Sequence, residues 1–110
     1  MATSGEVQHL AENLMWLKRN VPSASGDYFT YDALRDAILR IDPDMEISTG
    51  HLSAIHRGAK PAIGARLLWD IAGVYAIDHR FFFDATTRND IKVAVTTYGS
   101  LRKRVVDDGH

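Results

Sequence analysis

Basic and imidazole side chains are concentrated in one short part of the sequence, residues 48–69. This stretch contains no acidic residue, and its basic and imidazole side chains are Arg57, Lys60, Arg66, His51 and His56. Basic groups that cluster in this way attract phosphate, because they create a local positive field even when the whole chain is almost neutral. The stretch therefore predicts a surface suited to phosphate contact.

The whole chain has a net charge of −1, which is distributed unevenly. Residues 1–47 hold four basic and eight acidic side chains, residues 70–90 hold two and four, and residues 91–110 hold four and two. Non-specific DNA affinity comes from lysine and arginine, so the total charge alone argues against nucleic acid. The position of the positive charge, in residues 48–69, changes that interpretation.

Metal binding and catalysis are not indicated by the side chains that could support them. His51 and His56 are five residues apart, which places them about 140° from each other around a helix, so one ion cannot easily bind both. Asp42 and Asp44 flank Pro43 and are more simply turn residues than a catalytic pair. The sequence has no nucleophile elbow and no phosphate-binding loop. We expect no enzyme activity, no catalytic residue, no metal, no cofactor and no small-molecule ligand.

Length and composition indicate one globular domain. The chain has 110 residues, of which 45% are hydrophobic and 25% are charged, as in ordinary globular proteins. No run approaches the roughly eighteen apolar residues that cross a membrane, and the first residues, MATSGEV, do not resemble an export signal. The absence of cysteine excludes disulfide bonds. We expect a cytoplasmic protein with no membrane partner.

The basic stretch begins with a short predicted helix, residues 49–57. Ser48 is a suitable N-cap, because its hydroxyl can accept a hydrogen bond from a backbone amide two or three residues on. Leu52 and Ile55 share one face, and the other positions carry no long apolar group. Gly58 can end the helix in the left-handed conformation without a Cβ penalty. A helix this short is not stable alone and needs a scaffold.

Two earlier helices are predicted to supply part of that scaffold. The first covers residues 7–19, after a frayed polar start, and its apolar positions are Val7, Leu10, Ala11, Leu14 and Leu17. The second begins after the N-cap Thr30 and stops at Asp42-Pro43-Asp44, because proline cannot continue a helix. Its expected buried face consists of Leu34, Ala37, Ile38 and Ile41.

The rest of the scaffold is predicted after the basic stretch. A helix over residues 63–75 is expected to bury Leu68, Ile71, Ala72 and Tyr75. Asp78 is expected to cap a brief fifth helix that carries three adjacent phenylalanines, residues 81–83. These three cannot all point to one side, so at least one should close the core and another should be free to meet a partner. Trp16 and Trp69 are expected in core or interface packing.

A last helix is predicted over residues 87–107, with Thr87 and Asp90 as an approximate capping box. Steps of three and four residues separate Ile91, Ala94, Tyr98, Leu101 and Val105. This is the spacing of a seam that packs on another helix, and together with Phe83 it would form the interface of a homodimer. The alternative is that this helix folds back on its own domain.

The segments together resemble the Xre/Cro-type helix-turn-helix regulators of phages and bacteria and, within that group, the actinobacterial EspR-like type. The resemblance rests on LAENL (10–14), FTYDALRDAI (29–38), ISTGHLSAIHRG (47–58), LLWDIA (67–72) and FFFD (81–84). It implies an all-α fold, with a compact five-helix lambda-repressor-like DNA-binding domain over residues 7–84 and a C-terminal dimerisation helix over 87–107. The family often has proline where the fourth helix starts and glycine after its end, positions held here by Ile63 and Ala76.

The resemblance also implies a function, which is transcription regulation or nucleoid association through double-stranded DNA. The helix over 49–57 would enter the major groove, and the helix before it would cross the DNA backbone. Base edges would be met by Thr49, Gly50, His51 and Ala54, and phosphates by Ser48, Ser53, Arg57 and Lys60. His56 would make groove or solvent contacts. Relatives tend to carry larger base-reading side chains, so we expect modest sequence specificity, supplemented by DNA shape and by two copies binding together.

An alternative function belongs to another class. A protein-interaction module, such as an adaptor or an antitoxin-like partner, could keep the same fold without reading DNA. The small residues Gly50 and Ala54 and the near-neutral charge favour this alternative.

Overall fold

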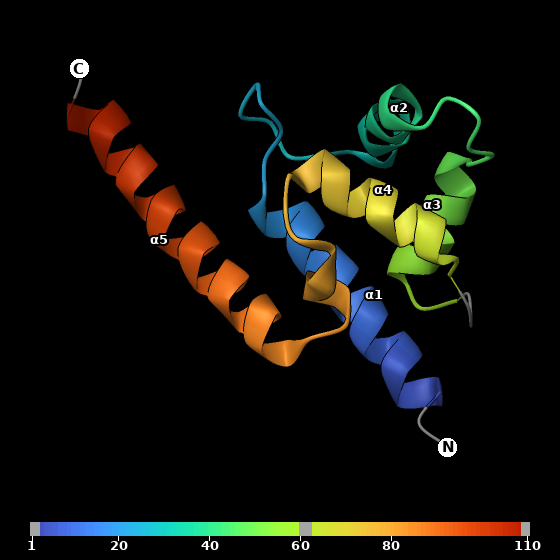
Figure 1. Cartoon of the computed structure of the whole chain (residues 1–110). Coiled ribbons are helices and arrows are strands. Elements are labelled where there is room, and N and C mark those ends of the chain that lie inside the picture. Colours follow the sequence, from blue (N-terminus) through green and yellow to red (C-terminus); the bar gives the residue numbers. More distant parts are fainter. Residues whose placement is uncertain (1–2, 60–62, 109–110) are drawn as a thin grey trace.

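The structure, a computed structural model, is all-helical over the residues that it describes. It describes the backbone of residues 3–59 and 63–108 and the side chains of residues 9–59 and 63–97. Figure 1 shows the elements, which are α1 (Thr3–Asn20), α2 (Tyr31–Ile41), α3 (Thr49–His56), α4 (Ala65–Tyr75), the 3-10 helix η1 (His79–Phe82) and α5 (Ala85–Asp108). The all-α class predicted from the sequence is confirmed. Within the described ranges, no helix is both long and apolar enough to cross a membrane.

Three helix starts are fixed by the side chains that the sequence pattern selected. The Thr30 hydroxyl accepts a hydrogen bond from the Ala33 amide at 3.1 Å, and the Ser48 hydroxyl accepts one from the His51 amide at 3.1 Å. The Asp78 carboxylate accepts one from the Arg80 amide at 2.9 Å. Each bond satisfies an amide that has no partner inside its helix. The predicted N-caps of α2, α3 and η1 are therefore confirmed.

The first residues of α1, α4 and α5 differ from the prediction. The first helix begins at Thr3, four residues earlier than expected, and α4 begins at Ala65, two residues later than expected. The predicted capping box at Thr87 is wrong. Asp84 accepts hydrogen bonds from the Thr87 amide at 3.0 Å and from the Thr87 hydroxyl at 2.5 Å, so α5 starts at Ala85.

One apolar core receives side chains from α1, α2, α3, α4 and η1. Its fully buried large members are Leu14, Leu17, Leu34, Ile38, Leu52, Ile55, Ile71 and Phe81. Burying one such side chain contributes about 1.5–3 kcal/mol, and this is how a scaffold supports a helix that is too short to form alone. Ile41 was expected in this core but is 49% exposed at the end of α2.

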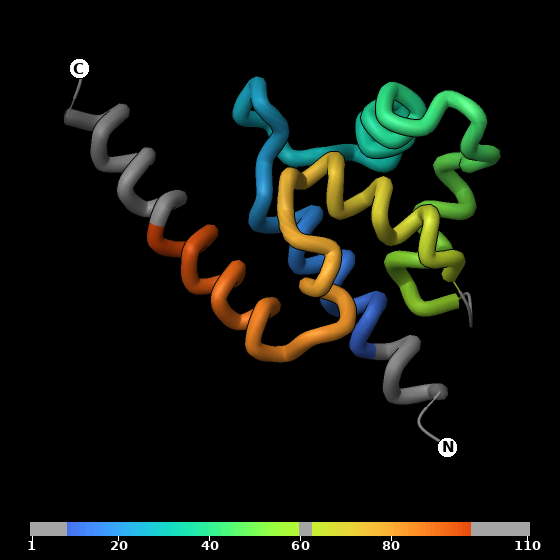
Figure 2. Tube along the Cα trace, in the orientation of Figure 1, coloured from blue at the N-terminus to red at the C-terminus, as the bar shows by residue number. Residues whose placement is uncertain are grey.

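The three phenylalanines divide between core and surface, as expected. Phe81 and Phe82 are buried with their rings edge to face, whereas Phe83 is 63% exposed. The Arg88 guanidinium on α5 donates to the Phe81 carbonyl at 3.1 Å, which joins the start of α5 to η1. In Figures 1 and 2, α5 leaves η1 in the direction away from α3. The first turns of α5 are thus fixed to the core through η1.

Candidate nucleic-acid interface

The scaffold holds α3 by one face. Leu52 and Ile55 are buried in the core, and α3 packs against α1 and α2. Gly58 follows the helix with a φ of 74°, and a Cβ at this position would lie 3.5 Å from Cβ of Ala11 on α1. The predicted left-handed end of α3 is therefore confirmed. The left-handed Gly58 turns the chain at the point where α3 contacts α1.

The opposite face of α3 is accessible to solvent. Ser48, Gly50 and Arg57 are exposed, and Thr49, His51, Ser53 and Ala54 are half-buried. The Arg57 side chain reaches back along the helix and donates to the Ser53 carbonyl at 3.3 Å. Lys60 lies outside the described residues. The accessible face therefore combines hydroxyl groups, a guanidinium, and an exposed stretch of backbone at Gly50 that no side chain covers.

His56 does not belong to this face, and its expected groove or solvent contact is wrong. Its side chain is 3% exposed, and Nδ1 lies 2.7 Å from the Leu52 carbonyl oxygen. The ring packs edge to face on Tyr31 of α2, with centroids 5.2 Å apart. Burial lowers the pKa of His56, and the nearby Lys18 lowers it further, although the bond to the Leu52 carbonyl acts in the opposite direction. The sequence offered a signal for this burial, because His56 lies four residues after Leu52 on the same helical face.

The segment that leads into α3 is longer than a usual helix-turn-helix turn. Residues 42–48 separate α2 from α3, whereas three or four residues are common in the motif. Arg35 of α2 donates from Nε to the Ile47 carbonyl at 3.1 Å, immediately before the Ser48 cap. This bond fixes the end of the linker against α2. Nothing in the sequence pattern singled out Arg35, because its partner is twelve residues away.

The positive charge around α3 is smaller than the sequence suggested. Arg66 of α4 donates from Nε to Asp42 at 2.7 Å and also donates from its terminal nitrogen to the other Asp42 oxygen. Its charge is therefore largely compensated. Asp44 and Glu46 lie exposed in the linker before α3. Arg57, the C-terminal cap residue of α3, remains as an exposed arginine at this helix.

The predicted dimer seam is divided in the structure. Ile91 is half-buried and packs against the core of its own domain, which fits the fold-back alternative for the start of α5. Ala94 is exposed on the same helix, as is the neighbouring Val93. The side chains of Tyr98, Leu101 and Val105 lie outside the described residues.

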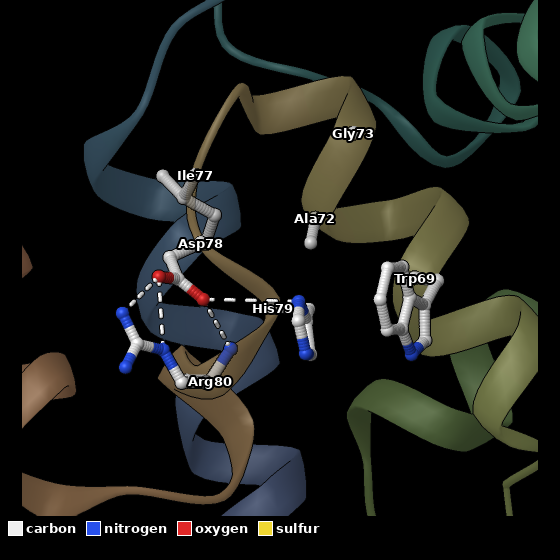
Figure 3. Close-up of a pocket in the computed structure, with 7 residues that line it drawn as sticks. All are labelled: Trp69, Ala72, Gly73, Ile77, Asp78, His79 and Arg80. Carbon is white, nitrogen blue, oxygen red and sulfur yellow. Dashed lines mark hydrogen bonds and ion pairs between the residues drawn. The ribbon is translucent and has the colours of Figure 1, made fainter.

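A second surface feature, which the sequence did not predict, lies between α4 and η1 (Figure 3). It is a hollow of about 410 Å³ lined by Trp69, Ala72, Gly73, Ile77, Asp78, His79 and Arg80. Of the two expectations for Trp69, core and interface packing, the core is wrong, because Trp69 is 56% exposed; it stacks on His79, with ring centroids 3.8 Å apart. Arg80 holds Asp78 through two side-chain bonds and lowers the pKa of Asp78 to about 2.

The chain matches no family model, no curated protein and no solved structure. Among the residues that the structure describes, no group of three or more histidine, cysteine, aspartate or glutamate side chains could hold a metal ion. The exposed face of α3 and the hollow between α4 and η1 are the two candidate functional surfaces in the described part of the chain.

Proposed function

We propose that this chain binds double-stranded DNA with modest sequence specificity by inserting α3 into the major groove. The observation that carries the proposal is the division of α3 into two faces. Leu52, Ile55 and His56 anchor it to the scaffold, and the hydroxyl groups and Arg57 face solvent. An α-helix with its side chains is about 10–12 Å in diameter, and the major groove is about 12 Å wide, so the exposed side of α3 can enter it.

The roles of the side chains follow from their size. Thr49 and His51 can hydrogen-bond to base edges near the start of α3, and Gly50 and Ala54 allow the backbone to approach. Ser48, Ser53, Arg57 and Lys60 are suited to phosphate, which positions the helix without selecting a sequence. None of the base-facing residues has a long side chain that could make two hydrogen bonds to one base. We therefore expect DNA shape to contribute to sequence selectivity.

This function agrees with the resemblance to Xre/Cro-type regulators and places the protein on the nucleoid in the cytoplasm, as a transcription regulator or a nucleoid-associated protein. A homodimer would present two copies of α3 to half-sites about one helical turn, or roughly 34 Å, apart. Ala94 on α5 and Phe83, just before α5, are exposed, which supports a contact with a second copy through this part of the chain.

Fluorescence anisotropy with a labelled random duplex, measured between about 50 and 200 mM salt, tests the proposal. A homodimer that neutralises about four phosphates, through Arg57 and Lys60 of each copy, should lose roughly 150-fold in affinity over this range. Arg57→Gln removes one phosphate contact from each copy, so it should weaken binding and reduce the salt slope by about two. Arg19→Gln is the matched control, because Arg19 is an exposed arginine in the last turn of α1, outside α3 and its caps. No binding at low salt, or equal effects of the two variants, would refute the proposal.

A protein-interaction module is the second candidate function, and the exposed Trp69 favours it. Tryptophan is enriched in the small set of residues that dominate protein interfaces, and here it lines a hollow. Asp44 and Glu46, exposed before α3, would also repel phosphate. If the DNA assay is negative, this candidate becomes the preferred function.

A further inference from the structure

Three charged side chains connect the end of α2 with the start of α4. Asp42 is the C-terminal cap residue of α2, Arg66 lies in the first turn of α4, and Asp70 lies one turn further along α4. The Arg66 guanidinium donates hydrogen bonds to both carboxylate oxygens of Asp42, with Nε at 2.7 Å from one of them. We refer to Asp42, Arg66 and Asp70 as the carboxylate clamp.

The clamp lies where the linker to α3 begins. The Asp42 amide donates to the Ile38 carbonyl at 2.8 Å, and the Asp42 carbonyl accepts from the Met45 amide at 3.0 Å. Asp42 therefore takes part in the last turn of α2, in the first turn of the linker and in the contact with α4. A change in the clamp would affect all three.

Asp70 lacks a donor in this arrangement. Its carboxyl lies against that of Asp42, and its Oδ2 atom is buried with no hydrogen-bond partner among the described residues. Arg66, the positive group that faces Asp70, bonds through Nε and one terminal nitrogen to Asp42 and makes no hydrogen bond to the buried oxygen of Asp70. Asp44 also faces Arg66 and adds negative charge to the site. A buried oxygen of this kind is costly unless it gains a partner, and a proton on one carboxyl would provide the missing bond.

We propose that Asp42 and Asp70 share one proton on mild acidification, and that this proton strengthens the clamp between α2 and α4. The proton comes from solvent and binds Asp70, whose hydroxyl then donates to the Asp42 carboxylate. Arg66 keeps Asp42 ionised, so Asp70 is the member that takes up the proton. The inference does not depend on the proposed function.

The electrostatics agree with this assignment. Burial, the hydrogen bond that a protonated Asp70 can donate to Asp42, and the charge of Asp42 raise the pKa of Asp70 to about 6, and Arg66 opposes the change. The hydrogen bond from Arg66 lowers the pKa of Asp42. Because Asp70 binds its proton more tightly in the folded than in the unfolded chain, the stabilisation is complete below the ordinary value of 3.8 and is lost as pH rises through about 6.

Thermal unfolding of the wild type and of Asp70→Asn between pH 4.5 and 7.5 tests the proposal. Asparagine has the same size, carries no charge, and can donate an amide hydrogen to Asp42 at every pH. We expect the variant to melt a few degrees above the wild type at pH 7.5, and the difference to shrink as pH falls. Other titrating groups are common to both proteins, so the difference isolates Asp70. A variant that melts at or below the wild type at pH 7.5, or a difference independent of pH, would overturn the proposal.

Carbon-13 NMR of the side-chain carboxyls provides a second measurement that does not depend on stability. The Asp70 signal of the wild type should titrate with a midpoint near 6. In Asp42→Asn the midpoint should move toward the ordinary value of an aspartate, because the neighbouring carboxylate is absent. A wild-type midpoint near 4 would rule out proton sharing at this site, even if the variants failed to fold.

Discussion

Nδ1 of His56 lies 2.7 Å from the carbonyl oxygen of Leu52, one turn earlier in α3. Because a carbonyl can only accept, Nδ1 carries the hydrogen and Nε2 has a bare lone pair. Nε2 is buried and has no partner among the described residues. Protonation would place a hydrogen on Nε2 with no acceptor and a second positive charge near Lys18. The neutral imidazole is thus a structural part of the support beneath α3.

Acidification should weaken the domain through His56. Because its folded pKa lies below the ordinary 6.5, its contribution is complete above pH 6.5 and falls by up to about 1.4 kcal/mol for each pH unit below it. Urea unfolding between pH 5 and 7.5 should be performed in the Asp70→Asn background, because Asp70 titrates in the same range with the opposite sign. Adding His56→Leu should flatten the dependence.

His9→Gln is the matched control for this experiment, since His9 is exposed on α1. It should leave the pH dependence of the unfolding free energy unchanged. Asp42, Asp78 and Asp84 have pKa values that are lowered in the fold, so they do not titrate in this window. A pH dependence that persists without His56 would show that another group is responsible.

Gly58 and Ala76 both adopt left-handed backbone, with φ values of 74° and 56°, and should respond oppositely to exchange. Gly58→Ala should cost about 1 kcal/mol, because an alanine in this conformation is strained. Its Cβ would meet Ala11 at an ordinary contact distance, so crowding adds little. Ala76→Gly should stabilise by roughly 0.5–1 kcal/mol, since relief of strain exceeds the added entropy of the unfolded chain. Urea unfolding measures both, and equal signs would contradict the assignment of strain.

Local patterns predicted the N-caps of α2, α3 and η1 correctly. Thr30, Ser48 and Asp78 act on amides two or three residues away, so the necessary information is contained in neighbouring residues. Competition between two nearby candidates was not resolved in this way, as Asp84 rather than Thr87 caps α5. Aspartate is preferred over threonine as an N-cap, so the sequence did contain a signal for Asp84 that the choice of Thr87 overlooked.

Contacts across the fold could not be predicted in the same way. Arg66 appeared to belong to a basic surface, but its partner Asp42 is twenty-four residues earlier. The tie from Arg35 to the Ile47 carbonyl depends on how the linker returns to α2, which no spacing rule specifies. Trp69 was expected in core or interface packing, and its residue type could not decide between the two, whereas its position on α4 places it on the surface. The composition of the candidate surface was therefore predicted better than its charge.

Loss of the Arg35 side chain should loosen the linker in front of α3. Arg35→Leu removes the donor to the Ile47 carbonyl and should lower the free energy of unfolding by about 1 kcal/mol. Arg40→Leu is the control, because Arg40 is an exposed arginine on the same helix, and its effect should stay within about 0.5 kcal/mol. Hydrogen exchange should speed up at residues 47–52 in Arg35→Leu only. Equal effects of the two substitutions would show that the tie contributes nothing.

The division of the α5 seam gives different expectations for Ile91 and Ala94. Ile91 packs on its own core, so Ile91→Ala should lower the free energy of unfolding by about 1–2 kcal/mol, less than for a fully buried isoleucine. Its effect on self-association should be small. Ala94 is exposed, so Ala94→Glu should leave the stability of the isolated domain unchanged and should dissociate a homodimer formed through this face.

Sedimentation velocity over a range of protein concentrations measures the self-association on which this distinction depends. Asn89→Glu introduces the same charge at an exposed position about 140° around α5 from Ala94, and should leave the dimer intact. If Asn89→Glu and Ala94→Glu dissociate the protein equally, long-range repulsion rather than contact at Ala94 is responsible. A wild-type chain that sediments as a monomer at every concentration would exclude the dimer and leave α5 as a helix fixed to its own domain through η1. DNA binding would then have to be explained by a single copy of α3.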